Sequence, residues 1–186
     1  MTNFKKTVLT PNEALIQIAK DELHQVYRQT IFALGNFRAP KEWLLNYTIY
    51  FSGLEHQQKN LITAYGQPML LTNVSFILLA TMSLNLFTYR SFPLAGRTNV
   101  WTHKTELFDR VDSHEENTAR YIHRLKSEIR SAGIVTTEII ANDKNGNYSV
   151  LWTVTDLIFN LDRLAKHSDA RISAPASNLL RLYSKT

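Results

Sequence analysis

Arginine, asparagine and serine side chains recur at helical spacing between residues 114 and 132. Asn117, Arg120, Arg124 and Ser127 follow one another at intervals of three or four residues, so on an α-helix they share one face. Arginine can donate two hydrogen bonds to guanine, asparagine can bond twice to adenine, and serine and lysine suit phosphate. These residue types at this spacing are chemically suited to contacts with the bases and phosphates of double-stranded DNA.

Other polar side chains extend this surface. His123, Lys126 and Arg130 lie along one flank of the same segment, and Lys104, Lys144 and Asn145 lie outside it. The same composition is also typical of an ordinary solvent-exposed helix face, so the surrounding elements must decide. The predicted DNA-binding residues are Asn117, Arg120, Arg124, Ser127, Lys126, His123, Lys104, Lys144 and Asn145.

The opposite side of this segment is apolar. Ser113 and Glu116 have the spacing of a capping box, which predicts a helix start, and Gly133 predicts its end. Between them, apolar or small residues repeat at spacings of four and three, as expected for a helix with one buried face: Thr118, Ile122, Leu125, Ile129 and Ala132.

Short elements are predicted on both sides of this helix. Residues 99–101 suggest a short strand and residues 104–111 a short helix. After Gly133 the apolar residues alternate, which predicts a β-hairpin with strands at 134–141 and 148–154. Asn145-Gly146 suits a two-residue turn, because both central positions of such a turn need a positive φ.

The N-terminal half is predicted to be helical. Thr10, Pro11 and Glu13 form a capping box that opens a long amphipathic helix ending near Gly35. Its apolar stripe suits either core packing or the seam of a homodimer. A second helix is expected from Pro40, a third after Ser52-Gly-Leu-Glu55, and a buried apolar helix at 73–89; the second carries Trp43, Leu44, Tyr47 and Tyr50.

The order of short strand, short helix, longer helix and hairpin resembles the winged helix-turn-helix superfamily. The junction Leu125–Val135, in which an apolar helix end is followed by Gly133 and two aliphatic residues, carries the resemblance together with that order. It covers the last third to half of the chain. It implies a mainly α fold with a small β-hairpin, in which a winged helix-turn-helix unit follows a helical N-terminal region.

We therefore expect three parts: a helical region at 1–96, with dimerisation through its first helix; a winged helix-turn-helix at 97–155; and a C-terminal helix and tail at 156–186. The C-terminal helix is expected at Thr155–Lys166. The outline is similar to that of multiple-antibiotic-resistance-type regulators, and also to that of plasmid and phage replication or copy-control proteins. The hairpin lacks the Asp-x-Arg pattern of the first family, and residues 38–66 are additional material.

Composition excludes several classes of protein. The chain has no cysteine, which rules out disulfides and zinc fingers. Its start lacks the apolar stretch of a secretory signal, so a cytoplasmic location is expected. Residues 60–89 carry no charge and could span a bilayer by length, yet several polar residues within them favour a buried helix over a membrane span.

Catalytic patterns are not evident. The 6 histidines never form a His-x-x-x-His pair, and the 6 glycines form no phosphate-binding loop. We expect no enzyme activity, cofactor or metal, and surface or boundary positions for the histidines.

The net charge of +5 mildly favours an anionic partner. Its excess lies outside the predicted DNA-binding unit, because residues 100–186 hold 12 basic and 11 acidic side chains. The sequence thus predicts binding of double-stranded DNA by a transcriptional regulator or a plasmid or phage replication or copy-control protein. The alternative is a winged-helix protein-interaction module that uses the first helix and the aromatic residues Trp43, Tyr47, Tyr50 and Phe51.

Overall fold

The computed structural model describes residues 48–65, 67–91, 100–111, 115–136, 139–150 and 156–183. The chain divides into two compact units, residues 1–38 and 39–186, and every described residue belongs to the second. The expected first helix, its role in a homodimer and the start of the expected second helix, with Trp43, Leu44 and Tyr47, lie outside the described residues.

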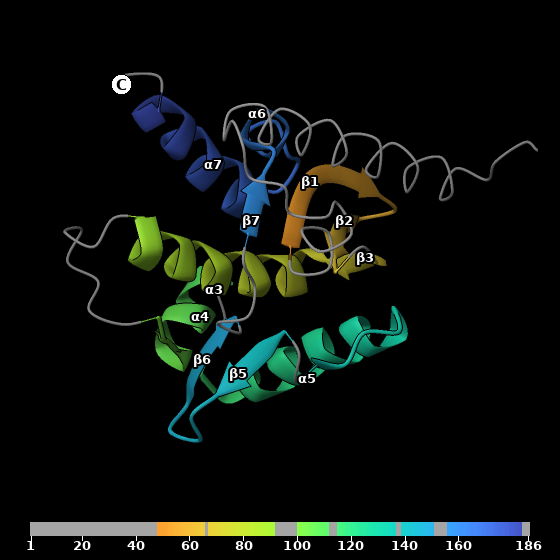
Figure 1. Cartoon of the computed structure of the whole chain (residues 1–186), viewed down its shortest axis with the longest axis vertical. Coiled ribbons are helices and arrows are strands. Elements are labelled where there is room, and N and C mark those ends of the chain that lie inside the picture. The colour runs from red at the N-terminus through yellow and green to blue at the C-terminus, as the bar shows by residue number, and fades with distance from the viewer. Residues whose placement is uncertain are drawn as a thin grey trace, which may run out of the picture. The chain divides into compact units, whose positions relative to one another are not determined.

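A four-stranded mixed sheet contains β1 (Thr48–His56), β2 (Lys59–Ala64), β3 (Gln67–Thr72) and β7 (Asp156–Phe159). The strand order is β3-β2-β1-β7 (Figure 1). The three N-terminal strands are antiparallel neighbours, whereas β7 runs parallel to β1. The sheet therefore pairs β1, the first described strand, with β7, the last one.

The expectation of a mainly α fold with a small β-hairpin is wrong, because the described residues form an α/β fold with this sheet and a second, three-stranded one. Strand β1 occupies Thr48–Tyr50, the described end of the expected second helix, and β1 and β2 replace the helix expected after Ser52. Ile49, Tyr50 and Phe51 are all buried, so the apolar side chains of β1 do not alternate with polar ones. Periodicity cannot distinguish a strand covered on both faces from a buried helix.

Ser52 and Gly53 form a bulge in β1 instead of a helix cap. The Ser52 hydroxyl donates to the carbonyl of Leu61 at 2.7 Å, and the register with β2 shifts between Phe51 and Leu54. Gly53 has a φ of +69°, and a Cβ atom there would lie 3.1 Å from the backbone nitrogen of Leu164. Both its φ and its close approach to the chain favour glycine.

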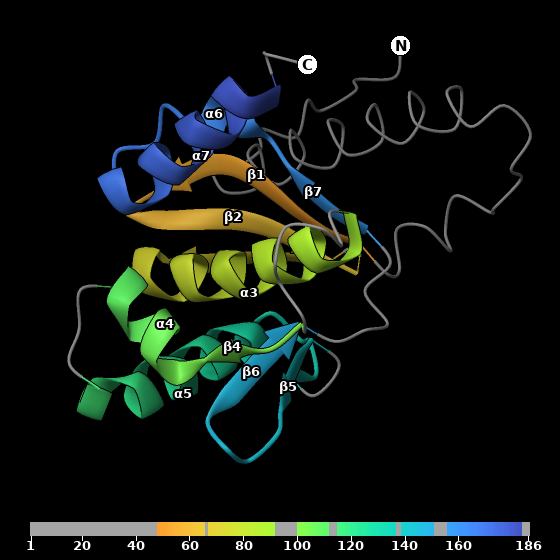
Figure 2. The same cartoon turned by 90° about the vertical axis from the view of Figure 1, so that its left-hand side faces the viewer.

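Helix α3 (Asn73–Ser91) forms where a buried helix was expected. It contacts β2 and β3 of the sheet, and also helices α4 and α5 and strands β4 and β6. Figure 2 shows it between the four-stranded sheet and these other elements. Among the described residues, no helix has the length and apolar character needed to span a membrane.

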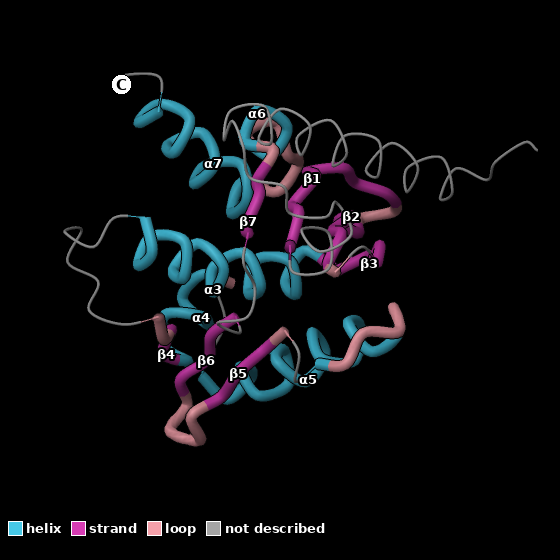
Figure 3. The backbone as a smooth tube through the Cα atoms, viewed as in Figure 1, coloured by secondary structure: helices cyan, strands magenta, loops and turns pink. Residues whose placement is uncertain are grey.

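The remaining elements build the second sheet and two helices. They are β4 (Thr102–His103), α4 (Lys104–Arg110), α5 (Glu115–Ser131), β5 (Ile140–Asn142) and β6 (Asn147–Val150). The sheet order is β4-β6-β5, with both pairs antiparallel (Figure 3). The order of these elements is the expected one, although the first strand lies at 102–103 and β5 is shorter than expected.

Gly133 ends α5, as expected. Its φ is +79°, its N–H donates to the carbonyl of Arg130 at 2.9 Å, and the N–H of Ile134 donates to the carbonyl of Ile129 at 3.4 Å. These two bonds form a Schellman motif. Ile129 and Ile134 are both buried in the core, which adds the apolar contact that accompanies this motif.

The hairpin turn differs from the expected two-residue turn at Asn145-Gly146. The positive φ values fall on Lys144 and Gly146, and the last paired residues are Asn142 and Tyr148. The carboxylate of Asp143 accepts the backbone N–H groups of Asn145 and Asn147 at 2.8 and 3.1 Å. The side-chain bonds of this aspartate stabilise a longer loop.

The C-terminal segment does not begin with the expected helix. Residues 156–159 form β7, followed by the short helix α6 (Leu161–Leu164) and by α7 (Ala170–Tyr183). Ile158 and Phe159 have high strand propensity, and with Leu157 they pair with β1, a partner more than 100 residues away. Local periodicity carries no information about that pairing.

Replacing either positive-φ glycine with alanine should destabilise the fold by different amounts. Gly133→Ala should cost about 1 kcal/mol, because only the backbone conformation is unfavourable and no atom lies within 4 Å of the new Cβ. Gly53→Ala should cost about 2 kcal/mol or more, because the Cβ also approaches Arg163 and Leu164. Urea unfolding measures both, with the exposed Ser131→Ala as the control. Equal losses would contradict the role of the close approach.

Candidate nucleic-acid interface

The apolar side of α5 is buried. Ile122, Leu125 and Ile129 are 4%, 0% and 0% exposed, and the helix contacts α3 and α4. The expected buried face is therefore confirmed at these positions; the side chain of Thr118 lies outside the described ones. Burial of this side fixes which side of α5 is available to a partner.

Four of the predicted residues lie together on the opposite side. Arg120, His123, Arg124 and Ser127 are exposed and, with Tyr121, line one shallow, open hollow. Figures 1 and 2 show α5 and the β5–β6 hairpin on the side of α3 away from the four-stranded sheet. The sheet therefore does not cover this face.

Asn117 and Lys126 are half-buried on α5. Lys126 belongs to the flank of the exposed face, as its position in the sequence indicates, and Asn117 lies one turn before Arg120. Both residues are less accessible to a partner than the four that line the hollow. Their backbone positions on the helix agree with the expected spacing.

Arg124 has an intramolecular partner. Its Nε lies 3.1 Å from Oε1 of Glu128, with the two side chains 54% and 18% exposed. The Glu128 carboxylate also accepts hydrogen bonds at 3.0 Å from the backbone N–H and from the hydroxyl of Thr72, at the end of β3. The spacing of four residues between Arg124 and Glu128 was the sequence feature that could have revealed the pair.

The remaining predicted residues lie at the hairpin. The backbone N–H of Lys104 donates to the carbonyl of Gly146 at 2.9 Å, and the Lys104 side chain lies against that glycine. Lys144 and Asn145 are exposed at the tip. Asp143 adds a negative charge beside them, and the hydrogen bond from the Asn147 side chain is the main cause of its lowered pKa. The tip therefore carries little net positive charge.

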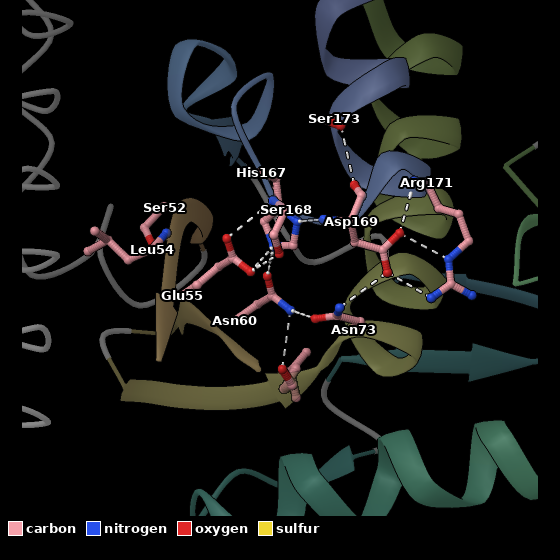
Figure 4. Close-up of polar contacts among 11 residues, drawn as sticks. Ser52, Leu54, Glu55, Asn60, Asn73, His167, Ser168, Asp169, Arg171 and Ser173 are labelled. Atoms are coloured by element: carbon pink, nitrogen blue, oxygen red, sulfur yellow. Dashed lines mark hydrogen bonds and ion pairs between the residues drawn. The ribbon is translucent and has the colours of Figure 1, made fainter. Parts of the chain in front are cut away.

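A buried polar cluster, which the sequence did not predict, surrounds His167 (Figure 4). The side chain of His167 is fully buried, so the expected surface or boundary position is wrong for this histidine. Its Nδ1 accepts the backbone N–H of Asp169 at 2.9 Å, so we assign the proton of the neutral ring to Nε2. Nε2 lies 2.6 Å from Oδ1 of Asn60 and 3.2 Å from Oε1 of Glu55.

Asp169 connects this cluster to the rest of the fold. Its carboxylate accepts the backbone N–H of Arg171 at 2.9 Å, which caps the start of α7, and also the Asn73 amide at 3.1 Å. The Arg171 guanidinium donates to the same carboxylate at 2.7 Å and to the carbonyl of Val111 at 3.2 Å. The hydrogen bonds from Arg171 are the main reason that the pKa of Asp169 is lowered to about 2.

The cluster joins separate elements of the fold through hydrogen bonds. Both ring nitrogens of His167 are engaged, and Ser168 donates to Glu55 rather than to the histidine. Within the described ranges, no group of three or more histidine, aspartate or glutamate side chains could hold a metal ion. The polar groups of the cluster are satisfied by one another, as buried polar groups must be.

Comparisons with protein-family models, with characterised protein sequences and with solved structures gave no match for this chain. The site must therefore be interpreted from its own geometry.

Asp169 should make stability depend on pH in the acid range. Its folded pKa of about 2 lies below the ordinary value of 3.8, so its contribution is present above about pH 4 and is lost as the pH falls towards 2. Asp169→Asn keeps a capping residue but removes the charge, and should lower the free energy of unfolding by about 1–2 kcal/mol at pH 7. The difference from the unsubstituted protein should shrink towards pH 2.

Urea unfolding at several pH values measures this difference. Asp109→Asn, at an exposed position of α4, shows how much any loss of a surface carboxylate contributes. A deficit in Asp169→Asn that stays constant from pH 7 to pH 2 would contradict the electrostatic origin of the effect.

Proposed function

We propose that this chain binds double-stranded DNA and that α5 is the helix that enters the major groove. The observation that carries the proposal is the exposed row of Arg120, His123, Arg124 and Ser127 on a helix whose other side is fixed in the core. An α-helix fits the major groove, where arginine reads guanine with two hydrogen bonds.

The arrangement of elements supports a winged helix-turn-helix. The order α3, β4, α4, α5, β5, β6, with the sheet order β4-β6-β5, gives a helix pair followed by a hairpin that returns to the first short strand. In helix-turn-helix proteins the second helix of the pair lies in the groove. On this proposal α4 crosses the DNA backbone, and α5 reads the bases.

The charges give the residues different roles. Arg120 has no ion pair with another described residue, whereas Arg124 forms an ion pair with Glu128. Arg120 is therefore the primary base-reading residue, and Arg124 contributes once DNA competes with Glu128. Lys126, Lys104 and Lys144 contact DNA phosphates, and such contacts position the protein without reading the base sequence.

We propose that the chain is a transcriptional regulator, or a replication or copy-control protein of a plasmid or phage, acting in the cytoplasm as a homodimer. The alternative, a protein-interaction module, would use an aromatic surface that includes Tyr50 and Phe51. These two side chains are only 2% and 0% exposed within β1. These two aromatic side chains are not available to a partner.

Arg120→Ala should weaken DNA binding. A side chain that reads a base contributes about 1–3 kcal/mol, so affinity for a DNA site selected from random sequence should fall about 5- to 150-fold. Fluorescence anisotropy with labelled duplex measures the loss. Arg181→Ala, an exposed arginine on α7, is the matched control and should leave affinity unchanged. Equal effects of the two variants would mean that α5 is not the reading helix.

The salt dependence of binding separates base reading from phosphate contact. Each lost phosphate contact lowers the slope of log affinity against log salt by about one. Lys126→Ala should therefore lower the slope, whereas Arg120→Ala should leave it nearly unchanged and relax the sequence preference. Repeating the duplex selection with each variant measures that preference. No binding to any selected duplex at low salt would overturn the proposed function.

A further inference from the structure

A half-enclosed apolar pocket lies between α3, β7, α6 and α7. Its volume is about 110 Å³, and it is separate from the exposed face of α5. Its inner surface includes the buried side chains of Phe76, Leu164 and Ile172. In Figure 1, α7 lies on the same side of α3 as the four-stranded sheet.

The rim of the pocket keeps large apolar side chains partly in contact with solvent. Leu84, Phe159, Leu161 and Leu179 line the pocket and are only half-buried. Each could bury more surface against an apolar guest, at about 25 cal/mol per Å². Water would find few partners in a space with such a lining. An apolar group is therefore the natural occupant of this pocket.

Most polar groups that line the pocket already have partners. The Thr81 hydroxyl donates to the carbonyl of Ile77, and the Asn85 amide donates to Thr102 and to Glu106. Arg171 is held by Asp169 and by the carbonyl of Val111. These groups are not the ones that an incoming ligand would have to satisfy.

Arg110 is the exception. It is the last residue of α4, lines the pocket and is exposed, and none of the carboxylates in the described ranges forms an ion pair with it. An arginine beside an apolar hollow suits a ligand with an apolar body and a carboxylate end, because the guanidinium can donate two parallel hydrogen bonds to a carboxylate.

We propose that this pocket binds a short-chain carboxylic acid, with the acyl chain between α3 and α7 and the carboxylate on Arg110. An apolar cavity of about 150 Å³ takes up benzene, so 110 Å³ matches a chain of about four or five carbons beyond the carboxylate. Hexanoate is the probe of this size. The proposal does not depend on DNA binding.

The test compares hexanoate with hexan-1-ol and hexylammonium, which have the same chain but no charge or the opposite charge. Isothermal titration on the DNA-free protein should show hexanoate binding about tenfold more tightly than hexan-1-ol, because the hydrogen bond to Arg110 is charge-assisted. Amide shifts in NMR spectra should centre on Ala80 and Ala176, which line the pocket. Decanoate should gain little over hexanoate.

Two variants separate the charge from the cavity. Arg110→Gln should reduce hexanoate affinity to that of hexan-1-ol and leave the alcohol unaffected, whereas Arg120→Gln on α5 should change neither. Ala80→Leu should fill the pocket and abolish binding of both, with circular dichroism as the check of folding. The alcohol comparison and Arg110→Gln do not alter the core, so they decide the question even if Ala80→Leu fails to fold.

Equal affinities for the three probes, an unchanged hexanoate affinity in Arg110→Gln, or much tighter binding of decanoate would each overturn the proposal. Because all of these measurements are made without DNA, their failure is distinct from a failure of the DNA-binding proposal.

Discussion

The fold depends on burial of α3 around most of its circumference. Phe76, Leu78, Leu79 and Met82 are all at most 2% exposed, although they project from different sides of the helix. A helix that is packed on several sides must be apolar nearly all round, which is why the sequence of this segment is similar to that of a membrane span. One core then includes residues of the four-stranded sheet on one side of α3 and of α4 and α5 on another.

Buried polar side chains on and around α3 determine how its neighbours are placed. Asn85 donates to the Thr102 hydroxyl at 2.6 Å and to Glu106 at 3.0 Å, which ties α3 to β4 and α4. At the other end, the Asn73 amide donates to the Asp169 carboxylate, and the Arg171 guanidinium donates to the carbonyl of Val111, at the end of α4. The C-terminal helix α7 is thus connected by hydrogen bonds to the helix pair. The pocket bordered by Arg110 and Arg171 lies on this connection.

Elements could be predicted from the sequence where their structure depends on interactions between residues close together in the chain. The 3.6-residue repeat of Ile122, Leu125 and Ile129 and the stop at Gly133 depend only on neighbouring residues, and both were found. The strands β1 and β2 were missed because burial on two faces removes alternation, and β7 because its partner β1 lies more than 100 residues away in sequence. Asn145-Gly146 was misread because the carboxylate of Asp143, and not glycine alone, determines the turn. The polar cluster at His167 joins residues far apart in sequence, so spacing could not reveal it.

The pairing of Arg124 with Glu128 is compatible with a place for Arg124 in the proposed DNA interface. The arginine side chain is 54% exposed, and exposed pairs of this kind contribute only about 0.3–0.5 kcal/mol. If Arg124 moves to an anionic partner, the Glu128 carboxylate keeps its two bonds to Thr72, immediately before α3, where the helix dipole favours a negative charge. Breaking the pair therefore leaves no buried group unsatisfied. In the free protein the same pair holds the arginine in a defined position on the exposed face, so the cost of ordering its long side chain is already partly met.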